Sequence, residues 1–351
     1  MKTLVLGYGR SGKAAEALLH RQGRTCEVAD GVDLVVVSPG VRVVSELQLG
    51  VEELKRRGVK MLAVTGSKGK SSVVKLVADA LGGVPCGNYG LPVSAVPDDC
   101  RWAVVEVSSF QMETTNLPPD TFEAAAILNL QEDHLDRHGS VALYHALKRR
   151  LLAAARVSFD CDAPPADALL AGSYFDNDVL RKNGAIAAAL MRVAGLDDGA
   201  IAAAFRAFEP LPHRMSEVGV FDGVRYIDDS KATSLAALAA GVRMVDGPVR
   251  LIAGGLPKGD DPKGVLDALT GRVKKCYTIG HAAETFARAW QGPVDCEICG
   301  TLERAVQAAR REAARGETVL LSPGAASFDQ FQSFGARGDA FAGLVKKGKD
   351  T

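Results

Sequence analysis

The sequence predicts an α/β protein made of three consecutive units. Apolar runs that end in glycine turns precede segments of helical composition, first over residues 2–23 and again over residues 59–83. From about residue 213, strands alternate with alanine-rich helices, which predicts a parallel sheet with helices on its faces. We therefore expect domains over residues 1–60, 61–212 and 213–351.

Composition and charge favour a globular protein with no general affinity for nucleic acid. The chain is 47% hydrophobic, and its 42 Lys and Arg residues equal its 42 Asp and Glu residues. A nucleic-acid binder normally has a basic surplus. The N-terminus turns into glycines after a very short apolar run, so we expect no signal peptide, no membrane span and a cytoplasmic location.

The cysteines predict neither a disulfide framework nor a zinc site. Seven cysteines are scattered along the chain, which suits a reducing compartment. Cys296 and Cys299 form a lone C-x-x-C pair. A zinc site would need a second pair or nearby histidines, so we interpret both as ordinary thiols.

The first unit opens like a dinucleotide-binding fold. Gly7, Gly9 and Gly12 form G-x-G-x-x-G between a strand and a helix, and a second strand ends in Asp30. In such folds the helix N-terminus meets phosphate and the strand-end acid meets ribose. The alternative is that the glycines only permit a tight turn. A further strand is predicted over residues 32–41, and the unit is short for a complete Rossmann domain.

The second unit contains a loop, "TGSKGKSS", between a strand and a helix. The strict phosphate-loop pattern needs glycine where Val64 stands, so that pattern fails. Two glycines still allow backbone N–H groups to turn toward phosphate, Lys70 can reach the β- and γ-phosphates, and Ser71 can hold Mg²⁺. The alternative is a glycine turn with surface lysines.

Acidic and histidine residues follow the next two strands. Glu106 ends one strand at the sheet edge where ligands bind in open α/β sheets, and a carboxylate suits Mg²⁺. A solvated strand-end glutamate is the alternative. The stretch "NLQEDHLDRHGS" concentrates Asp133, His134 and His138 after another strand, which indicates metal or phosphate contact. Helix capping by Asp133 is the simpler interpretation.

The third unit repeats this arrangement. "IDDSKATS" places Asp229 and Lys231 after a strand. "SPGAASFDQFQSFGARGDAF" follows the last strand, and its small residues suggest a close-packed binding turn. Its phenylalanines also fit an ordinary core.

With these motifs in order, the chain resembles the Mur ligases. The stretches that carry the resemblance span most of the chain and are "TGSKGKSS", "GNYGLP", "EVSSFQME", "NLQEDHLDRHGS", "LPHRMSEV", "DDSKATS" and "SPGAASFDQFQSFGARG". The last two point to the branch of the family that adds D-glutamate. The resemblance implies a small Rossmann-like N-terminal domain for the UDP-sugar, a central phosphate-loop ATPase domain, and a Rossmann-like C-terminal domain that admits the amino acid.

The resemblance also implies the reaction. ATP phosphorylates the carboxylate of UDP-MurNAc-L-Ala, and the amine of D-glutamate attacks the acyl phosphate to give an amide, ADP and phosphate. It implies Mg²⁺ as cofactor, with two ions, and a carbamylated Lys148. Two anions must approach each other, so metal ions and lysines neutralise charge at the transferring phosphoryl group. The partners are these small molecules alone, and we expect a monomer.

The resemblance assigns a role to each candidate site residue. The catalytic residues are Lys70, Glu106, His134, Lys148 and Lys231. The ATP-binding residues are Gly66, Ser67, Lys68, Gly69, Lys70, Ser71, Ser72, Asn183, Arg214 and Asp229. The metal ligands are Ser71, Glu106, His134 and the carbamate of Lys148. The substrate-binding residues are Gly9, Arg10, Ser11 and Asp30 for uridine diphosphate, Asn88, Ser109 and Gln111 for the sugar-peptide, and Thr233, Lys258, Ser327, Phe328 and Phe334 for D-glutamate.

The chain departs from the family pattern in two ways. It is shortened after Asp30 and again between residues 159 and 171, where family strands are absent. Single positions also differ: Lys68 and Ile186 stand where the family has asparagine. Two alternatives therefore stay open. One is a related ATP-dependent amide ligase with another acceptor or amino acid, and the other is a degenerate, non-catalytic ligase that acts as a binding protein.

Overall fold

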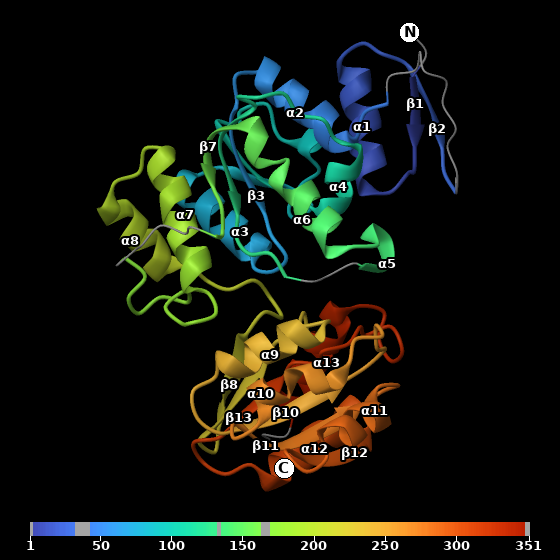
Figure 1. Ribbon diagram of the computed structural model, residues 1–351, viewed down its shortest axis with the longest axis vertical. Helices are drawn as coiled ribbons and strands as arrows, with labels where there is room; N and C mark the ends of the chain where they lie inside the picture. The colour runs from blue at the N-terminus through green and yellow to red at the C-terminus, as the bar shows by residue number, and fades with distance from the viewer. Residues whose placement is uncertain (1–2, 32–42, 132–134, 163–168, 348–351) are drawn as a thin grey trace. The chain divides into compact units, whose positions relative to one another are not determined.

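The computed structural model describes residues 3–31, 43–131, 135–162 and 169–347, and the chain divides into two compact units, Met1–Phe208 and Glu209–Thr351 (Figure 1). The strand expected over residues 32–41 lies outside the described residues. None of the helices in the described ranges is long and apolar enough to cross a membrane.

The chain begins with the strand, glycine turn and helix that the sequence predicts. Strand β1 (Thr3–Leu6) pairs in parallel with β2 (Cys26–Ala29), and helix α1 (Arg10–Arg21) connects them. A Cβ atom on Gly12 would lie 1.9 Å from the Gly7 carbonyl oxygen, so the close approach of α1 to the turn requires glycine there. This two-stranded sheet is separate from the larger sheet that follows.

A five-stranded parallel sheet forms the centre of the first unit, in the order β4-β5-β3-β6-β7. The sequence predicted β3, β5 and β6, and did not predict the short outer strands β4 and β7. The bounds are β3 Lys60–Thr65, β4 Val84–Gly87, β5 Trp102–Glu106, β6 Phe122–Ile127 and β7 Ala155–Phe159.

Helices cover both faces of this sheet, which explains why its central strands are continuous apolar runs. Side chains of α2, α4 and α6 pack on one face, and α3 and α7 pack on the other, with α8 against α3 and α7. The bounds are α2 Glu46–Arg56, α3 Lys70–Leu81, α4 Ser109–Thr114, α5 Leu135–His138, α6 Val141–Arg149, α7 Arg181–Val193 and α8 Asp198–Ala207, with short turns η1 Val93–Ala95 and η2 Leu152–Ala154.

The second unit contains a six-stranded sheet in the order β12-β11-β10-β13-β9-β8. Its strands are parallel except β8, which pairs with β9 in an antiparallel hairpin. Asp222 and Gly223 form the two-residue turn with φ values of 54° and 80°, as a twisted hairpin requires. The prediction of a parallel sheet missed this edge strand, although Asp-Gly between apolar residues is a hairpin signal.

The strands of this sheet are β8 Ser216–Phe221, β9 Val224–Asp228, β10 Val249–Gly254, β11 Val273–Ile279, β12 Asp295–Gly300 and β13 Thr318–Leu321. The helices are α9 Leu235–Arg243, η3 Pro262–Val265, α10 Leu266–Leu269, α11 Ala283–Trp290, α12 Leu302–Glu312 and α13 Phe334–Lys347.

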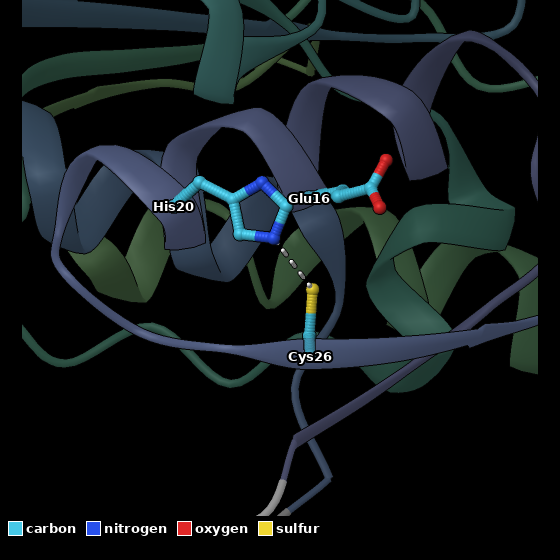
Figure 2. A group of neighbouring side chains, drawn as sticks. All are labelled: Glu16, His20 and Cys26. Atoms are coloured by element: carbon cyan, nitrogen blue, oxygen red, sulfur yellow. Dashed lines mark hydrogen bonds between the residues drawn. The ribbon is translucent and has the colours of Figure 1, made fainter.

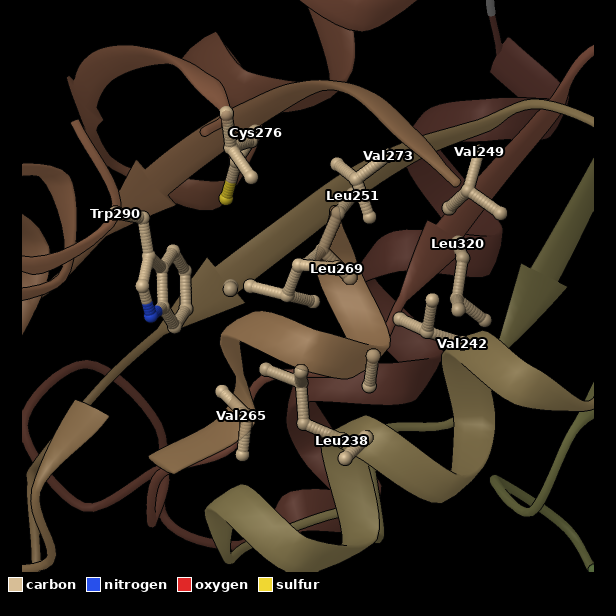
Figure 3. Close-up of a cluster of buried hydrophobic side chains, with 14 of the residues drawn as sticks. Leu238, Val242, Val249, Leu251, Val265, Leu269, Val273, Cys276, Trp290 and Leu320 are labelled. Atoms are coloured by element: carbon tan, nitrogen blue, oxygen red, sulfur yellow. The ribbon is translucent and has the colours of Figure 1, made fainter. Parts of the chain in front are cut away.

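Apolar cores fill both faces of the second sheet. Figure 3 shows the cluster in which α9, α10 and α11 pack on strand residues such as Leu251 and Leu320, with Trp290 at one end. Helices α12 and α13 pack on the opposite face, around Tyr226, Ile252 and Leu321. Successive side chains along each strand thus pack alternately against the helices on one face and on the other. In both units the predicted motifs lie in loops at the carboxyl ends of parallel strands.

Candidate nucleotide and metal site

The loop after β3 is shaped by two glycines. Gly66 has φ +150° and Gly69, which precedes α3, has φ +82°. A Cβ on Gly69 would lie 2.3 Å from Asn183 Nδ2, so glycine also allows the loop to pack closely on α7. Ser71 and Ser72 are buried in the first turn of α3. The loop and the positive end of the helix together form an arrangement that suits phosphate.

Side chains from two other segments hold this loop. Asn129, which follows β6, accepts from the Lys68 backbone N–H at 2.8 Å and donates to the Lys68 carbonyl at 2.9 Å. Its amide also lies 3.3 Å from Asn183 Oδ1. Lys70 Nζ donates to the carbonyls of Gly66 and Ser67 at 2.8 and 3.1 Å. Sequence reasoning missed Asn129, although it stands directly after a central strand in a quoted motif.

Glu106 lies at the end of β5, in register with Val64 of β3 and therefore beside the loop. Its Oε1 accepts a hydrogen bond of 2.8 Å from Asn88 Nδ2. Its Oε2 is buried and has no hydrogen-bond partner in the parts of the chain that the structure describes. A buried carboxylate oxygen without a partner is costly, and a cation would satisfy it.

Lys148 of α6 is buried below the same loop, with 1% of its surface exposed. Its Nζ donates to the Gly66 carbonyl at 3.0 Å and lies 4.6 Å from the centre of the Tyr144 ring. Tyr144 Oη in turn lies 3.1 Å from Ser67 Oγ. Helix α6 thus buries beneath this loop a lysine that its sequence alone would place on the surface.

These segments enclose a pocket of about 240 Å³. It brings together several of the predicted residues and adds the neighbouring Ser108, Phe110 and Tyr144, which sequence reasoning had not assigned. The lining residues are Ser67, Lys70, Asn88, Ser108, Ser109, Phe110, Tyr144 and Lys148. Gln111 completes a capping box with Ser108 at the start of α4. The predicted ligand His134 lies outside the described residues.

In the second unit, Asp228 is the last residue of β9 and Asp229 follows it. Asp229 is buried, and its carboxylate accepts from Ser322 Oγ at 2.9 Å and from the Met215 backbone N–H at 3.3 Å. Burial raises the pKa of Asp229 to about 7, against the opposing effect of these bonds and of the Arg214 charge. Asp228 Oδ2 lies 2.6 Å from His213 Nδ1.

The residues predicted for the amino acid lie on three loops of this unit and, in the case of Phe334, at the start of α13. Lys231 Nζ is 4.0 Å from the centre of the Phe334 ring, and Thr233 is two residues further along the same loop. Reciprocal backbone bonds between Leu256 and Ala326 join the other two loops. These carry exposed Lys258 on one side, and buried Ser327 and 71% exposed Phe328 on the other.

Arg337 ties these loops together and was not predicted. Arg337 is 1% exposed, and its guanidinium donates to the Ser230 hydroxyl and carbonyl at 2.9 Å each. It also donates to the carbonyls of Ala325 at 3.2 Å and of Gly254 and Ala326 at 3.4 Å. Burial lowers its pKa to about 10. Arg337 therefore fixes the chain after β9, β10 and β13.

The residues predicted for uridine diphosphate are exposed around the first glycine turn. They are Gly9, Arg10, Ser11 and Asp30. Asp30 Oδ1 accepts from the Tyr8 backbone N–H at 3.1 Å. Arg10 donates to the Gly90 carbonyl at 2.7 Å, within the quoted stretch "GNYGLP". The glycine turn is therefore hydrogen-bonded to the segment that contains the pocket residue Asn88.

Comparison with known proteins identifies the family. Residues 64–158 match the Mur ligase middle domain, and residues 213–325 match the glutamate ligase domain of Mur ligases. Over 98% of its length, the chain is 35% identical to the UDP-N-acetylmuramoylalanine–D-glutamate ligase of Myxococcus xanthus and 37% identical to that of Rubrobacter xylanophilus, and 98% of each relative is covered. The chain belongs to the Mur ligase family.

Solved structures share the fold. The MurF ligase of Thermotoga maritima in complex with ADP has a TM-score of 0.65 at 15% identity, over 99% of this chain and 95% of that one. The UDP-N-acetylmuramate-alanine ligase MurC of Thermotoga maritima has a TM-score of 0.61 at 14% identity, over 99% and 100%. The alignment with the Myxococcus relative is 448 residues long, which exceeds this 351-residue chain and confirms that it is a shortened member.

The residues of this Mur ligase fit a divalent cation. Glu106 offers an oxygen without a partner in the described structure, and Ser71 adds a hydroxyl in the first turn of α3. Two other groups of potential ligands lie elsewhere in the described residues: Glu16, His20 and Cys26, and Asp160, Cys161 and Asp162. In the first group Cys26 Sγ is 3.9 Å from His20 Nε2 (Figure 2), and Glu16 accepts from Tyr8. Neither group includes Glu106, so the expected Mg²⁺ ligands are a separate set.

Proposed function

We propose that this chain is an ATP-dependent ligase that adds D-glutamate to UDP-N-acetylmuramoyl-L-alanine during peptidoglycan precursor synthesis. The names of the relatives, which match nearly the whole chain, support this substrate pair. The observation that carries the proposal is the pocket, in which Lys70 and Lys148 lie beside the phosphate loop and Asn88 connects it to Glu106. The Lys70 cation and a carboxylate oxygen without a partner in the described residues suit a metal-bound nucleotide and an anionic acceptor.

Each step then has a group to assist it. The γ-phosphoryl group of ATP passes to the acceptor carboxylate, which gives an acyl phosphate and ADP. The amine of D-glutamate attacks the carbonyl carbon, the C–O bond to phosphate breaks, and the amine loses a proton. Lys70 and the backbone of the loop from Gly66 to Ser72 bind the phosphates and stabilise the charge that develops on them. When bound, Mg²⁺ neutralises phosphate charge, with Ser71, Glu106 and His134 as its proposed ligands.

We assign the other residues by the segments that carry them. Lys68, Asn183, Arg214 and Asp229 are proposed to bind ATP. Lys231 is proposed to assist catalysis. Thr233, Lys258, Ser327, Phe328 and Phe334 form the D-glutamate pocket, in which Lys258 pairs with a carboxylate. Gly9, Arg10, Ser11 and Asp30 bind the uridine diphosphate, and Asn88, Ser109 and Gln111 bind the sugar-peptide. The functional division is residues 1–60, 61–212 and 213–351.

Lys148 is proposed to act as a carbamate. An ammonium group would repel a nearby metal ion, whereas a carbamate is an anion that can bind one. Its burial, and its place under the loop within the pocket wall, support this modification. The same features argue against a protein that only binds, because a binder has no need of a carbamylated lysine. We further propose a monomer in the cytoplasm, where ATP is available.

Phosphate release tests the proposal. Purified protein is mixed with ATP, Mg²⁺, UDP-MurNAc-L-Ala and D-glutamate, and free phosphate is measured. We expect release only when all are present. A panel of other amino acids and acyl acceptors serves as the control for specificity. Absence of release with the complete mixture would refute the proposal, and release with another pair alone would favour a different ligase of the same family.

A further inference from the structure

His138 lies directly behind the pocket wall and has no role in the reaction described above. It ends α5, and its side chain is 1% exposed. Its Nε2 is 3.0 Å from Ser109 Oγ, and Ser109 lines the pocket. His138 is therefore one hydrogen bond away from any ligand that Ser109 contacts.

The other ring nitrogen is also fixed. His138 Nδ1 lies 3.1 Å from Glu113 Oε1. Arg137 holds both oxygens of Glu113, with Nε 3.0 Å from Oε1 and Nη2 2.6 Å from Oε2. The guanidinium, and to a smaller extent His138, lower the pKa of Glu113. Glu113 is thus ionised and acts only as a hydrogen-bond acceptor.

The surrounding residues hold the imidazole ring in one orientation. Ser109 and Glu113 are four residues apart on α4 and so share a face of the helix. The rings of Phe110 and Tyr144, both in the pocket wall, have their centres 5.5 and 5.4 Å from that of His138. Ring packing, the hydrogen bond to Ser109 and the close contact with Glu113 favour this orientation of the imidazole.

The partners also decide where the ring proton resides. Glu113 can only accept, so an imidazole with one proton carries it on Nδ1. Nε2 is then an acceptor, and the Ser109 hydroxyl donates to it. Because its proton is engaged, the Ser109 oxygen offers lone pairs toward the pocket.

We propose that His138 is a positioning residue that fixes Ser109 as the acceptor for an N–H group of the bound ligand. The inference rests on the proposed function, in which the carboxylate to be activated lies next to the amide N–H of the L-alanine residue. Lys70 supplies the positive charge that attracts the carboxylate, and Ser109 supplies the complementary acceptor for the amide. The pocket thereby recognises a carboxylate together with the amide N–H beside it.

The proton position can be measured without any ligand. The full-length protein, which has 6 histidines, is labelled with ¹⁵N at the imidazole nitrogens, and the His138 signals are assigned by their loss in His138→Asn. Where the ring holds a single proton, we expect that proton on Nδ1, and we expect a changed Nε2 shift in Ser109→Ala. A proton on Nε2 would overturn the inference.

Two substitutions of His138 separate positioning from packing. Asparagine keeps a donor near Glu113 but does not reach Ser109, whereas glutamine reaches Ser109. Ser109→Ala and His138→Asn are each expected to raise KM for UDP-MurNAc-L-Ala about two- to tenfold, the loss of one hydrogen bond, with little change in kcat. The double variant should be no weaker than either single one. His138→Gln should recover most of the loss, and His20→Asn, at an exposed histidine, is the control.

A substrate analogue tests the N–H group itself. An acceptor with an ester in place of the L-alanine amide lacks that donor. It should bind the unaltered protein more weakly than the amide by the same factor, and Ser109→Ala should not distinguish the two. Equal weakening by His138→Asn and His138→Gln would show a packing role only and refute the inference. If the unaltered protein releases no phosphate at all, the proposed function fails, and the proton position measured by NMR still decides the role of His138.

Discussion

Replacing Asp229 by asparagine should make the second unit more stable at alkaline pH. The Asp229 carboxyl is buried between Ser322 and the Met215 backbone, and burial raises its pKa from 3.8 to about 7. Below pH 3.8 the folded and unfolded chains both hold the proton. Between the two values only the folded chain holds it, so the free energy of unfolding falls as pH rises. Above about pH 7 Asp229 is ionised in both the folded and the unfolded chain, and the free energy of unfolding is lowered by the full cost of burying its charge.

The size of the effect follows from the shift. Each pKa unit corresponds to about 1.36 kcal/mol, so a shift of about three units gives a penalty of ~4 kcal/mol, an upper bound. Between about pH 5 and pH 8 the unaltered protein should lose ~3 kcal/mol that Asp229→Asn does not lose. The side-chain oxygen of the substituted asparagine can accept from the Met215 N–H, and its NH₂ group can donate to Ser322 Oγ.

Tryptophan fluorescence gives a suitable assay. The chain has 2 tryptophans, and in a Trp102→Phe background the buried Trp290 reports on the second unit alone. Urea unfolding is measured at about pH 5 and pH 8 for both proteins, and the midpoints and slopes give the two free energies. Equal pH dependence in the two proteins would refute the reasoning, because Asp229 would then not hold a proton in the fold.

Two further predictions concern the pocket lysine Lys148 and the packing of α13 in the second unit. Lys148→Ala should lower kcat about 10²–10³-fold, as expected for loss of a fixed charge-stabilising group, with partial recovery in formate or acetate. A ¹³C carbamate signal after labelling with bicarbonate should vanish in this variant, and unchanged turnover would contradict the assigned role. Gly338→Ala should lower the free energy of unfolding by about 1–3 kcal/mol, because the new Cβ would lie 2.1 Å from His213 Nδ1 and 2.5 Å from Asp228 Oδ2. Gly343→Ala on the same helix meets nothing within 4 Å and should instead stabilise the protein by about 0.5–1 kcal/mol, so equal effects would refute the steric argument.

The sequence by itself determined the features that depend on local order. The loop between β3 and α3, the strand-end Glu106 and the glycine turn before α1 were predicted because neighbouring residues set their conformation. The family resemblance came from the order of such motifs. The antiparallel strand β8 was missed although its Asp-Gly turn is a local hairpin signal, because the alternation of strands and helices predicted parallel pairing.

Only the tertiary structure decided which distant residues meet. Lys148 reads as a surface lysine, and it is buried because α6 lies under the phosphate loop. Ser109 and Glu113 contact the same side chain only because α5 brings His138 against their helix. Arg337 donates to carbonyls at or just beyond the ends of three different strands. These contacts depend on the chain topology and on burial, and no single stretch of sequence determines either. Burial strengthens each polar interaction because the protein interior has a low dielectric constant.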